Sequence, residues 1–308
     1  MSAIRIENLS KIYRAAWGRR DTFAVKALSL EVKQGEVFGL LGPNGAGKTS
    51  TIHLLLNLIR PTTGGAFLFD RPVTETEVHR RLGYLPESVN LHTYYTGRAL
   101  LNFYAALCGV PVSQRESRIS AVLKLLELED AADKQVAKYS KGMAQRIGVA
   151  QALLHDPDLL ILDEPTASLD PVARHQFRGL LLELKGRGKT ILISSHILSE
   201  VEAVCDRVAI LESGALKRVG TLQELSAGGS TRLVVKETSG ALMEALAATA
   251  AEVTWFQGQV TIRCQDEAVR RSVEALLREH KVEIARVESE AQSLDEIFFS
   301  TIKGDPAT

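Results

Sequence analysis

The chain of 308 residues has only three cysteines, Cys108, Cys205 and Cys264, which lie far apart and form no C-x-x-C pair. Neither a zinc site nor a disulfide framework is therefore expected, and a reducing cytoplasm fits this composition. The sequence also lacks the run of about 20 apolar residues that a membrane helix requires. Its first residues have no apolar core of a signal peptide. We therefore expect a chain that does not cross a bilayer unaided.

Net charge is also lacking, because 37 Lys and Arg residues balance 37 Asp and Glu residues. This balance gives no support for a nucleic-acid or anionic-membrane surface, so no nucleic-acid partner is expected. Apolar residues make up 45% of the chain and charged residues 24%, which is ordinary for a soluble globular protein. The length favours one large domain and one small domain.

A glycine-rich segment organises the first half of the chain, because it fits the pattern G-x-x-x-x-G-K-[ST] of a phosphate-binding loop. The apolar run 37–41 before it predicts a buried strand, and segment 51–59 after it predicts a helix. Glycines let a loop turn its N–H groups toward a polyphosphate, and the start of a helix favours an anion. The segment comprises Gly42, Pro43, Asn44, Gly45, Ala46, Gly47, Lys48 and Thr49, followed by Ser50.

Two side chains of this loop have direct roles in binding a nucleotide. Lys48 can reach the β- and γ-phosphates, and the Thr49 hydroxyl can ligate Mg²⁺. The alternative is a glycine-rich turn that fits the pattern by chance, and the flanking strand and helix argue against it. The loop alone predicts binding of a nucleoside triphosphate and leaves open a kinase, a GTPase, a motor or a transporter ATPase.

The remaining sequence predicts an α/β fold with a mostly parallel sheet, because apolar strand-like runs alternate with helical patterns. Helical spacing dominates segment 96–154 and indicates a helical insert. The apolar run 159–162 ends in Asp163 and Glu164, and an open α/β sheet binds ligands at such strand ends. Further strands are expected at 3–9, 25–32, 66–69, 82–87, 190–194 and 207–211, and helices at 172–186 and 197–204.

A second domain is predicted after the linker-like segment 226–230. Its strands and helices alternate over about 80 residues, a usual domain size, and indicate an α+β domain. We expect a first domain at 1–227, with a helical subdomain at about 88–156, and a second domain at 228–308. Within the second domain, strands are expected at 232–236, 253–256 and 259–263, and helices at 240–249 and 266–280.

The order of further motifs makes the interpretation specific. Segment 139–146, Tyr-Ser-Lys-Gly-Met-Ala-Gln-Arg, resembles the signature sequence of ATP-binding cassette proteins, whose common form is L-S-G-G-Q. Asp163 and Glu164 follow at the interval that the family shows. Segment 167–170 lies where the family has its D-loop, and His196 follows two serines. The resemblance covers about residues 3–226 and implies a P-loop NTPase cassette with an antiparallel β part and a helical subdomain.

The family resemblance also implies two cassettes facing head to tail, with each ATP between one phosphate loop and the signature of the other copy. Ser140 and the Gly142 backbone would then face the γ-phosphate of the partner's ATP, beside Lys141 and with Asp170 in the D-loop. A Ser140 that only caps its helix is the structural alternative. The working unit would be a homodimer or a pair with a related cassette.

Roles in catalysis follow from the same resemblance. Asp163 would orient Mg²⁺ beside Thr49, and Glu164 would accept a proton from the attacking water or polarise it. His196 would contact the γ-phosphate; without the resemblance, a structural histidine is the alternative.

An aromatic residue upstream of the loop stacks on adenine in the family. Tyr13, in a segment expected to be a loop at 13–21, is assigned this role. Trp17 is a rival for it.

Three positions depart from the common family pattern. Glu87 replaces a Gln, so that a carboxylate stands near the expected Mg²⁺. In the signature, Lys141 replaces a Gly and Met143 replaces the Gln. Lys141 either adds positive charge at the phosphate or points to solvent. These variants, together with segments 83–87 and 293–298, resemble the bacterial branch that energises exporters of drugs, polysaccharides or small hydrophobic compounds.

The leading hypothesis is an ATPase subunit that dimerises on ATP, hydrolyses it and drives a separate membrane permease. Such a subunit would be cytoplasmic and peripheral on the inner face of the cell membrane. One alternative is a soluble cassette acting on ribosomes or other machinery, although such proteins usually join two cassettes in one chain. A regulator that binds nucleotide without hydrolysing it, and a P-loop kinase, are further alternatives. The sequence does not name the transported substrate.

Overall fold

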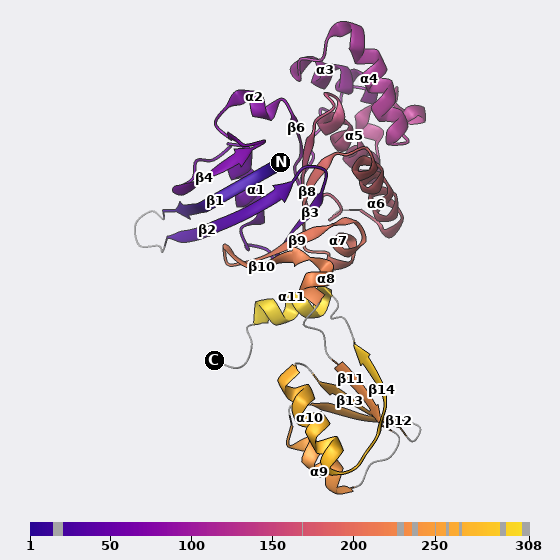
Figure 1. The fold of residues 1–308 in the computed structure, drawn as a ribbon. Helices are drawn as coiled ribbons and strands as arrows, with labels where there is room; N and C mark the ends of the chain where they lie inside the picture. The colour runs from indigo at the N-terminus through magenta and orange to yellow at the C-terminus, as the bar shows by residue number, and fades with distance from the viewer. Residues whose placement is uncertain are drawn as a thin grey trace. The chain divides into compact units, whose positions relative to one another are not determined.

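The computed structural model describes residues 1–14, 21–167, 169–226, 231–235, 240–249, 251–256, 259–264, 267–289 and 294–303. The chain divides into two compact units, Met1–Thr221 and Leu222–Thr308, and each has its own apolar core (Figure 1). Trp17 and Ser168, a residue of the expected D-loop, lie outside the described residues. Within the described residues, no helix combines the length and apolar character needed to span a membrane.

A six-stranded sheet with the order β10-β9-β3-β8-β7-β6 forms the centre of the first unit. Its neighbours pair in parallel except for β10, which runs antiparallel to β9. Every residue of β3, β7 and β8 is buried, as expected for strands covered on both faces. The strands are β3 (Val37–Leu41), β6 (Leu82–Leu85), β7 (Leu159–Asp163), β8 (Thr190–Ser195), β9 (Arg207–Glu212) and β10 (Ala215–Thr221).

The register of the central strands brings their carboxyl ends together. Leu40 of β3 lies beside Ser194 of β8, and Ser194 lies beside Asp163 of β7. Helices follow these strands, as a parallel sheet requires. They are α1 (Lys48–Leu55), α6 (Pro171–Gly186) and α7 (Leu198–Val204), with the short α2 (Thr76–His79) before β6. The segments that follow β3, β7 and β8 therefore meet at one edge of the sheet.

A smaller antiparallel sheet, with the order β2-β1-β4-β5, lies on the other side of α1 (Figure 1). Its apolar side chains share a core with α1 and with Phe38 of the central sheet. The loop expected at 13–21 was wrong at its start, because Tyr13 ends β1 and pairs with Thr22 of β2. The strands are β1 (Ser2–Tyr13), β2 (Thr22–Lys33), β4 (Thr63–Leu68) and β5 (Arg71–Pro72).

The helical insert predicted at 96–154 is confirmed. Its first long helix is capped by Thr96, whose hydroxyl accepts a hydrogen bond from the N–H of Ala99. Figure 1 shows the first two of these helices at the end of the unit away from β10. The elements are α3 (Gly97–Leu107), α4 (Val112–Leu125), the 3₁₀ turns η1 (Glu129–Ala131) and η2 (Val136–Lys138), and α5 (Lys141–Leu153).

The second unit contains an antiparallel sheet with the order β12-β13-β11-β14, and α9 and α10 pack on one of its faces. This βαββαβ order is that of a ferredoxin-like fold. The sequence analysis did not predict β14 or α11 here, nor β10 in the first unit. The elements are α8 (Leu222–Ser226), β11 (Thr231–Val235), α9 (Gly240–Ala247), β12 (Glu252–Phe256), β13 (Gln259–Cys264), α10 (Glu267–Glu279), β14 (Ile284–Ser289) and α11 (Leu294–Lys303).

Candidate active site

The phosphate loop adopts a backbone that only glycine takes without strain at two positions. Gly45 and Gly47 have φ angles of 81° and 102°. A Cβ atom on Gly47 would lie 2.3 Å from the carbonyl oxygen of Ala24, so the loop also packs too closely there for any side chain. No side chain caps α1, which begins at Lys48, so its first N–H groups are available to an anion.

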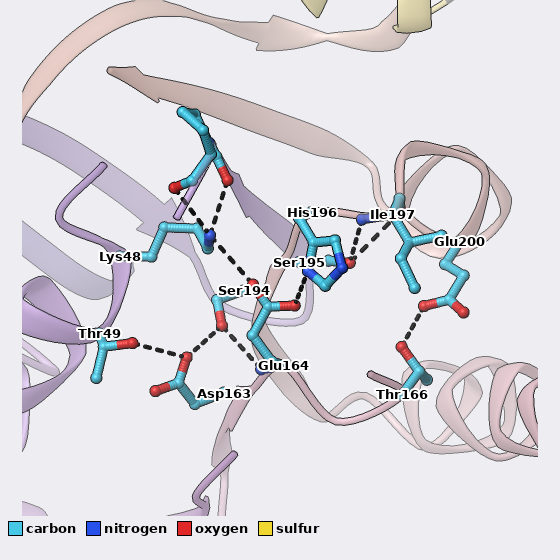
Figure 2. A network of polar contacts seen from close by, with 12 residues as sticks. Lys48, Thr49, Asp163, Glu164, Thr166, Ser194, Ser195, His196, Ile197 and Glu200 are labelled. Atoms are coloured by element: carbon cyan, nitrogen blue, oxygen red, sulfur yellow. Dashed lines mark hydrogen bonds and ion pairs between the residues drawn. The ribbon is translucent and has the colours of Figure 1, made fainter. Parts of the chain in front are cut away.

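Lys48 is buried and makes contacts on two sides. Its Nζ donates hydrogen bonds to the carbonyl oxygens of Gly42, at 2.7 Å, and Pro43, at 3.4 Å. The same Nζ lies 3.1 Å from Oε1 of Glu164, and both side chains of this ion pair are less than 10% exposed. The lysine is therefore held over the loop, with its charge compensated by the carboxylate that follows β7 (Figure 2).

Asp163, the last residue of β7, connects the loop to the neighbouring strand. Its Oδ1 accepts a hydrogen bond from the hydroxyl of Ser194 at 2.5 Å, and the hydroxyl of Thr49 lies 3.4 Å away (Figure 2). Asp163 is 1% exposed. A buried carboxylate with a hydroxyl close to it provides the hard oxygen ligands that Mg²⁺ prefers.

Glu164 has a strained backbone, since its φ angle is 47° and it is not a glycine. Its N–H donates to the Ser194 hydroxyl at 2.9 Å, and its Oε2 lies 2.7 Å from Nδ1 of His196. Strain of this kind persists only where surrounding contacts impose it, and it is concentrated at functional sites. The contacts with Lys48, Ser194 and His196 impose it here and aim the carboxylate into the cavity.

The potential beneath the site is negative. Burial, followed by the charges of Asp163 and Glu87, raises the pKa of the Tyr84 hydroxyl to about 12. Tyr84 therefore remains a neutral hydrogen-bond donor at all physiological pH values. This region thus combines Lys48 with the carboxylates of Asp163, Glu164 and Glu87, and suits a ligand that brings its own cation.

One cavity of about 570 Å³ collects most of the residues that the sequence analysis assigned to nucleotide binding. This volume is in the range of small-molecule sites. Tyr13 is 43% exposed, and Nζ of Lys11 lies 5.1 Å from the centre of its ring. The lining residues are Tyr13, Thr22, Ala24, Pro43, Asn44, Gly45, Ala46, Gly47, Lys48, Thr49, Ser50, Glu87, Glu164 and His196.

The four residues assigned to the signature and D-loop lie elsewhere. Ser140, Lys141, Gly142 and Asp170 line a second cavity of about 600 Å³. The Ser140 hydroxyl caps α5 by accepting from the N–H of Met143 at 3.2 Å. Asp170 caps α6 by accepting from the N–H of Ala173 at 2.9 Å. Within one chain these residues are therefore not part of the phosphate cavity, and the helix-capping alternative for Ser140 is real.

The donor set fits a magnesium ion bound together with phosphates. Among the described residues, no group of three or more His, Cys, Asp or Glu side chains could hold a metal alone. Mg²⁺ typically uses one or two carboxylates and takes its other ligands from phosphate oxygens and water. Asp163 and Thr49, with Glu87 lining the same cavity, match this pattern.

Ser194 and Gln145 are functional candidates that the sequence analysis missed. Ser194 bonds both acidic residues, and two serines at the end of a buried strand were the signal that could have revealed it. Gln145 of α5 donates to the carbonyl oxygen of Pro165 at 2.8 Å and is buried. This bond connects the signature helix to the loop that carries Glu164.

Comparisons with known proteins agree with this geometry. A family model described as "ABC transporter" matches residues 25–167, and one described as "ATP-binding protein DrrA1-3-like, C-terminal domain" matches residues 220–302. The second match covers most of the ferredoxin-like unit. The chain is thus a cassette followed by a DrrA-like C-terminal domain.

Similar proteins are found in three bacteria. An ABC transporter ATP-binding protein of Nostoc is 47% identical over 75% of this chain and 70% of its own length. The Bacillus subtilis ABC transporter ATP-binding protein YxlF is 35% identical over 97% of this chain and 99% of its length. The Nod factor export ATP-binding protein I of Burkholderia orbicola is 42% identical over 63% of this chain and 64% of its length.

Solved structures show the same fold. An ATP-binding subunit of an ABC transporter superposes with a TM-score of 0.65 at 31% identity, covering 73% of this chain and 92% of that one. A dimeric bacterial ABC transporter cassette gives 0.64 at 25% identity, covering 71% of this chain and 98% of that one. The chain belongs to the ABC transporter ATP-binding proteins, and the predicted α/β cassette is confirmed. It is an ATP-binding subunit of a family whose cassettes hydrolyse ATP, dimerise and pair with membrane permeases.

Proposed function

We propose that two cassettes close head to tail on Mg²⁺-ATP, hydrolyse it, and drive export through a separate membrane permease. The observation that carries the proposal is the convergence of Lys48, Asp163 and Glu164 where β3 and β7 end. The export direction is supported by the name of the Burkholderia relative, a Nod factor export ATP-binding protein. The subunit itself would lie at the inner face of the membrane, held there by the permease.

Each residue of the cavity has a part in this reaction. The N–H groups of the loop and Lys48 bind the phosphates, and Tyr13 offers its exposed ring to the adenine. Thr49, Asp163 and Glu87 would hold Mg²⁺, whose positive charge would compensate the charge of the phosphates. Together these residues fix the position of the γ-phosphate.

Glu164 is the residue proposed to accept the proton of the attacking water. A general base must point into the site and must be held in orientation, and the His196 contact at 2.7 Å holds Oε2. His196, about half exposed, also has its ring facing the cavity and is proposed to contact the γ-phosphate. Ser140, Lys141, Gly142 and Asp170 of the second copy complete the pocket across the dimer interface.

The permease contact is proposed at a cluster of aromatic residues that follows Glu87. The rings of Tyr94 and Tyr95 lie 4.5 Å apart, and Tyr95 stacks on Phe103 at 6.0 Å. Tyr94 is 68% exposed and Leu107 69% exposed. Exposed aromatic clusters are typical of protein interfaces, and this one adjoins the segment that enters the phosphate cavity.

The test of the proposed reaction is Glu164→Gln, with Glu77→Gln on the exposed face of α2 as a matched control. Loss of a general base slows hydrolysis by about 10²–10⁴-fold. The variant should bind ATP and accumulate as an ATP-bound dimer, measured by sedimentation, while the control should behave as wild type. Unchanged turnover in Glu164→Gln would remove the catalytic assignment.

A further inference from the structure

Glu87 and Lys141 have opposite charges, and neither has an ion pair or a side-chain hydrogen bond among the described residues. Both side chains are exposed. Other charged side chains that line the two cavities have polar partners within the chain. Lys48 forms an ion pair with Glu164, and Arg146 contacts Glu127 and Gln176. Glu87 lines the phosphate cavity, whereas Lys141 lines the signature cavity. Both therefore present an unpaired charge on surfaces that the proposed dimer brings together.

Glu87 adds a negative charge to a region that already holds two carboxylates. It contributes to the negative potential that raises the pKa of Tyr84, and Asp163 and Glu164 lie in the same region. A bound triphosphate adds further negative charge. A further cation beside Glu87 would therefore be attracted to this surface by Coulomb interaction.

Lys141 likewise has no ion-pair partner among the described residues of its own chain. It is the first residue of α5, where the helix dipole favours anions rather than cations. Asp170 lines the same cavity, but its carboxylate accepts from the N–H of Ala173 and makes no ion pair with Lys141. Among the described residues of the cassette, no contact of Lys141 explains a lysine at this position.

We propose that Lys141 forms an ion pair with Glu87 of the partner subunit when two copies close on ATP. The inference rests on the head-to-tail dimer proposed above, which places each signature against the other phosphate cavity. A carboxylate has two acceptor oxygens, so Glu87 could accept from Lys141 with one oxygen and still leave the other for Mg²⁺. Glu87 and Lys141 then act as a pair across the interface. Each side chain compensates the charge of the other, and the pair favours binding of a second copy of this chain.

The experiment measures ATP-driven dimerisation by sedimentation in the Glu164→Gln background, in which hydrolysis is slow. Lys141→Glu and Glu87→Lys each place like charges across both interfaces of a homodimer, and each should weaken dimerisation at least about tenfold. An equimolar mixture of the two variants restores opposite charges at both interfaces, and its dimerisation should recover. Lys138→Glu, an exposed lysine in η2, is the control with the same charge change and should match the background.

A fluorescent-nucleotide assay measures whether Glu87→Lys still binds ATP. If it binds ATP poorly, neutral variants test the ion pair instead. Lys141→Gln should weaken the dimer in the Glu87 background and have little effect after Glu87→Gln. An equal loss in both backgrounds would show that Lys141 contacts the phosphates instead, and would overturn the ion pair. Failure of the mixture to recover, with both variants binding ATP, would also overturn it. If the Glu164→Gln background itself stays monomeric with ATP, the proposed head-to-tail dimer fails first.

Discussion

The phosphate cavity and the signature surface of one chain differ in how their polar groups are bonded. Lys48, Asp163 and Glu164 are 6%, 1% and 8% exposed, and each bonds a residue from a different strand or loop. Ser140 and Asp170 are exposed and bond only the first turn of their own helices. Tertiary contacts hold the polar groups of the phosphate cavity, whereas the polar groups of the signature surface are exposed helix caps. In the proposed dimer, one chain would therefore contribute a preorganised half of each site and an exposed half.

The largest expected effect comes from breaking the buried ion pair of the phosphate cavity. Lys48→Met leaves the Glu164 carboxylate buried, with His196 as its remaining ionic partner. Removal of one partner from such a pair destabilises a protein by about 3–5 kcal/mol. Urea denaturation measured without nucleotide should show this loss, and the variant should also lose ATP affinity.

The matched double variant separates charge from packing. Adding Glu164→Gln to Lys48→Met removes the unpaired charge, so most of the lost stability should return although ATP binding does not. A double variant no more stable than Lys48→Met would contradict the role of the ion pair. On the signature surface, Lys141→Met should change stability by less than about 0.5 kcal/mol, because an exposed side chain is removed.

The sequence predicted those parts of the site that are local in the chain. The loop from Gly42 to Thr49 and the acidic pair after β7 were recognisable because each motif carries its own flanking strand and helix. The family resemblance added Tyr13, and the structure places this residue at the cavity together with Glu87 and His196. The roles given to these residues stay predictions until the variants are measured.

Contacts set by tertiary register were not predictable. Ser194 bonds Asp163 because β8 and β7 pair in one particular register, and no local pattern encodes that pairing. The ion pair between Lys48 and Glu164 has the same origin. Strand β14 was missed because it lies at a sheet edge, where Ile284 and Val287 remain exposed and the burial alternation is lost.

Gly47 of the phosphate loop and Gly142 of the signature surface test the difference between the two regions. Gly47→Ala places a Cβ 2.3 Å from the Ala24 carbonyl oxygen at a φ angle of 102°. Strain of this kind costs about 1–3 kcal/mol before the clash is added, so stability and ATP affinity should both fall. Thermal denaturation and nucleotide titration measure the two losses.

Gly142→Ala should behave in the opposite way in the isolated chain. A Cβ there meets only Ala173 and Ser140 atoms at 3.9 Å, which is ordinary contact. Replacing a helical glycine by alanine stabilises by about 0.5–1 kcal/mol, so the melting temperature should stay or rise. ATP-driven dimerisation should nevertheless weaken, because the added methyl group lies on the surface that approaches the partner's nucleotide. Loss of stability in Gly142→Ala would show that the position is structural.

The smallest effect distinguishes a cap from a contact across the dimer. Ser140 and Thr96 both cap helices of the helical insert, with hydroxyl-to-nitrogen distances of 3.2 Å and 3.3 Å. Replacing either by Ala removes one capping hydrogen bond and should cost about 1 kcal/mol in urea denaturation. Thr96 does not line the signature cavity, so Thr96→Ala should retain ATP-driven dimerisation, whereas Ser140→Ala should reduce it beyond what its stability loss explains. Equal dimerisation in the two variants would show that Ser140 serves only as a helix cap. The contact with the partner's ATP would then depend on the backbone of Gly142 and on Lys141 alone.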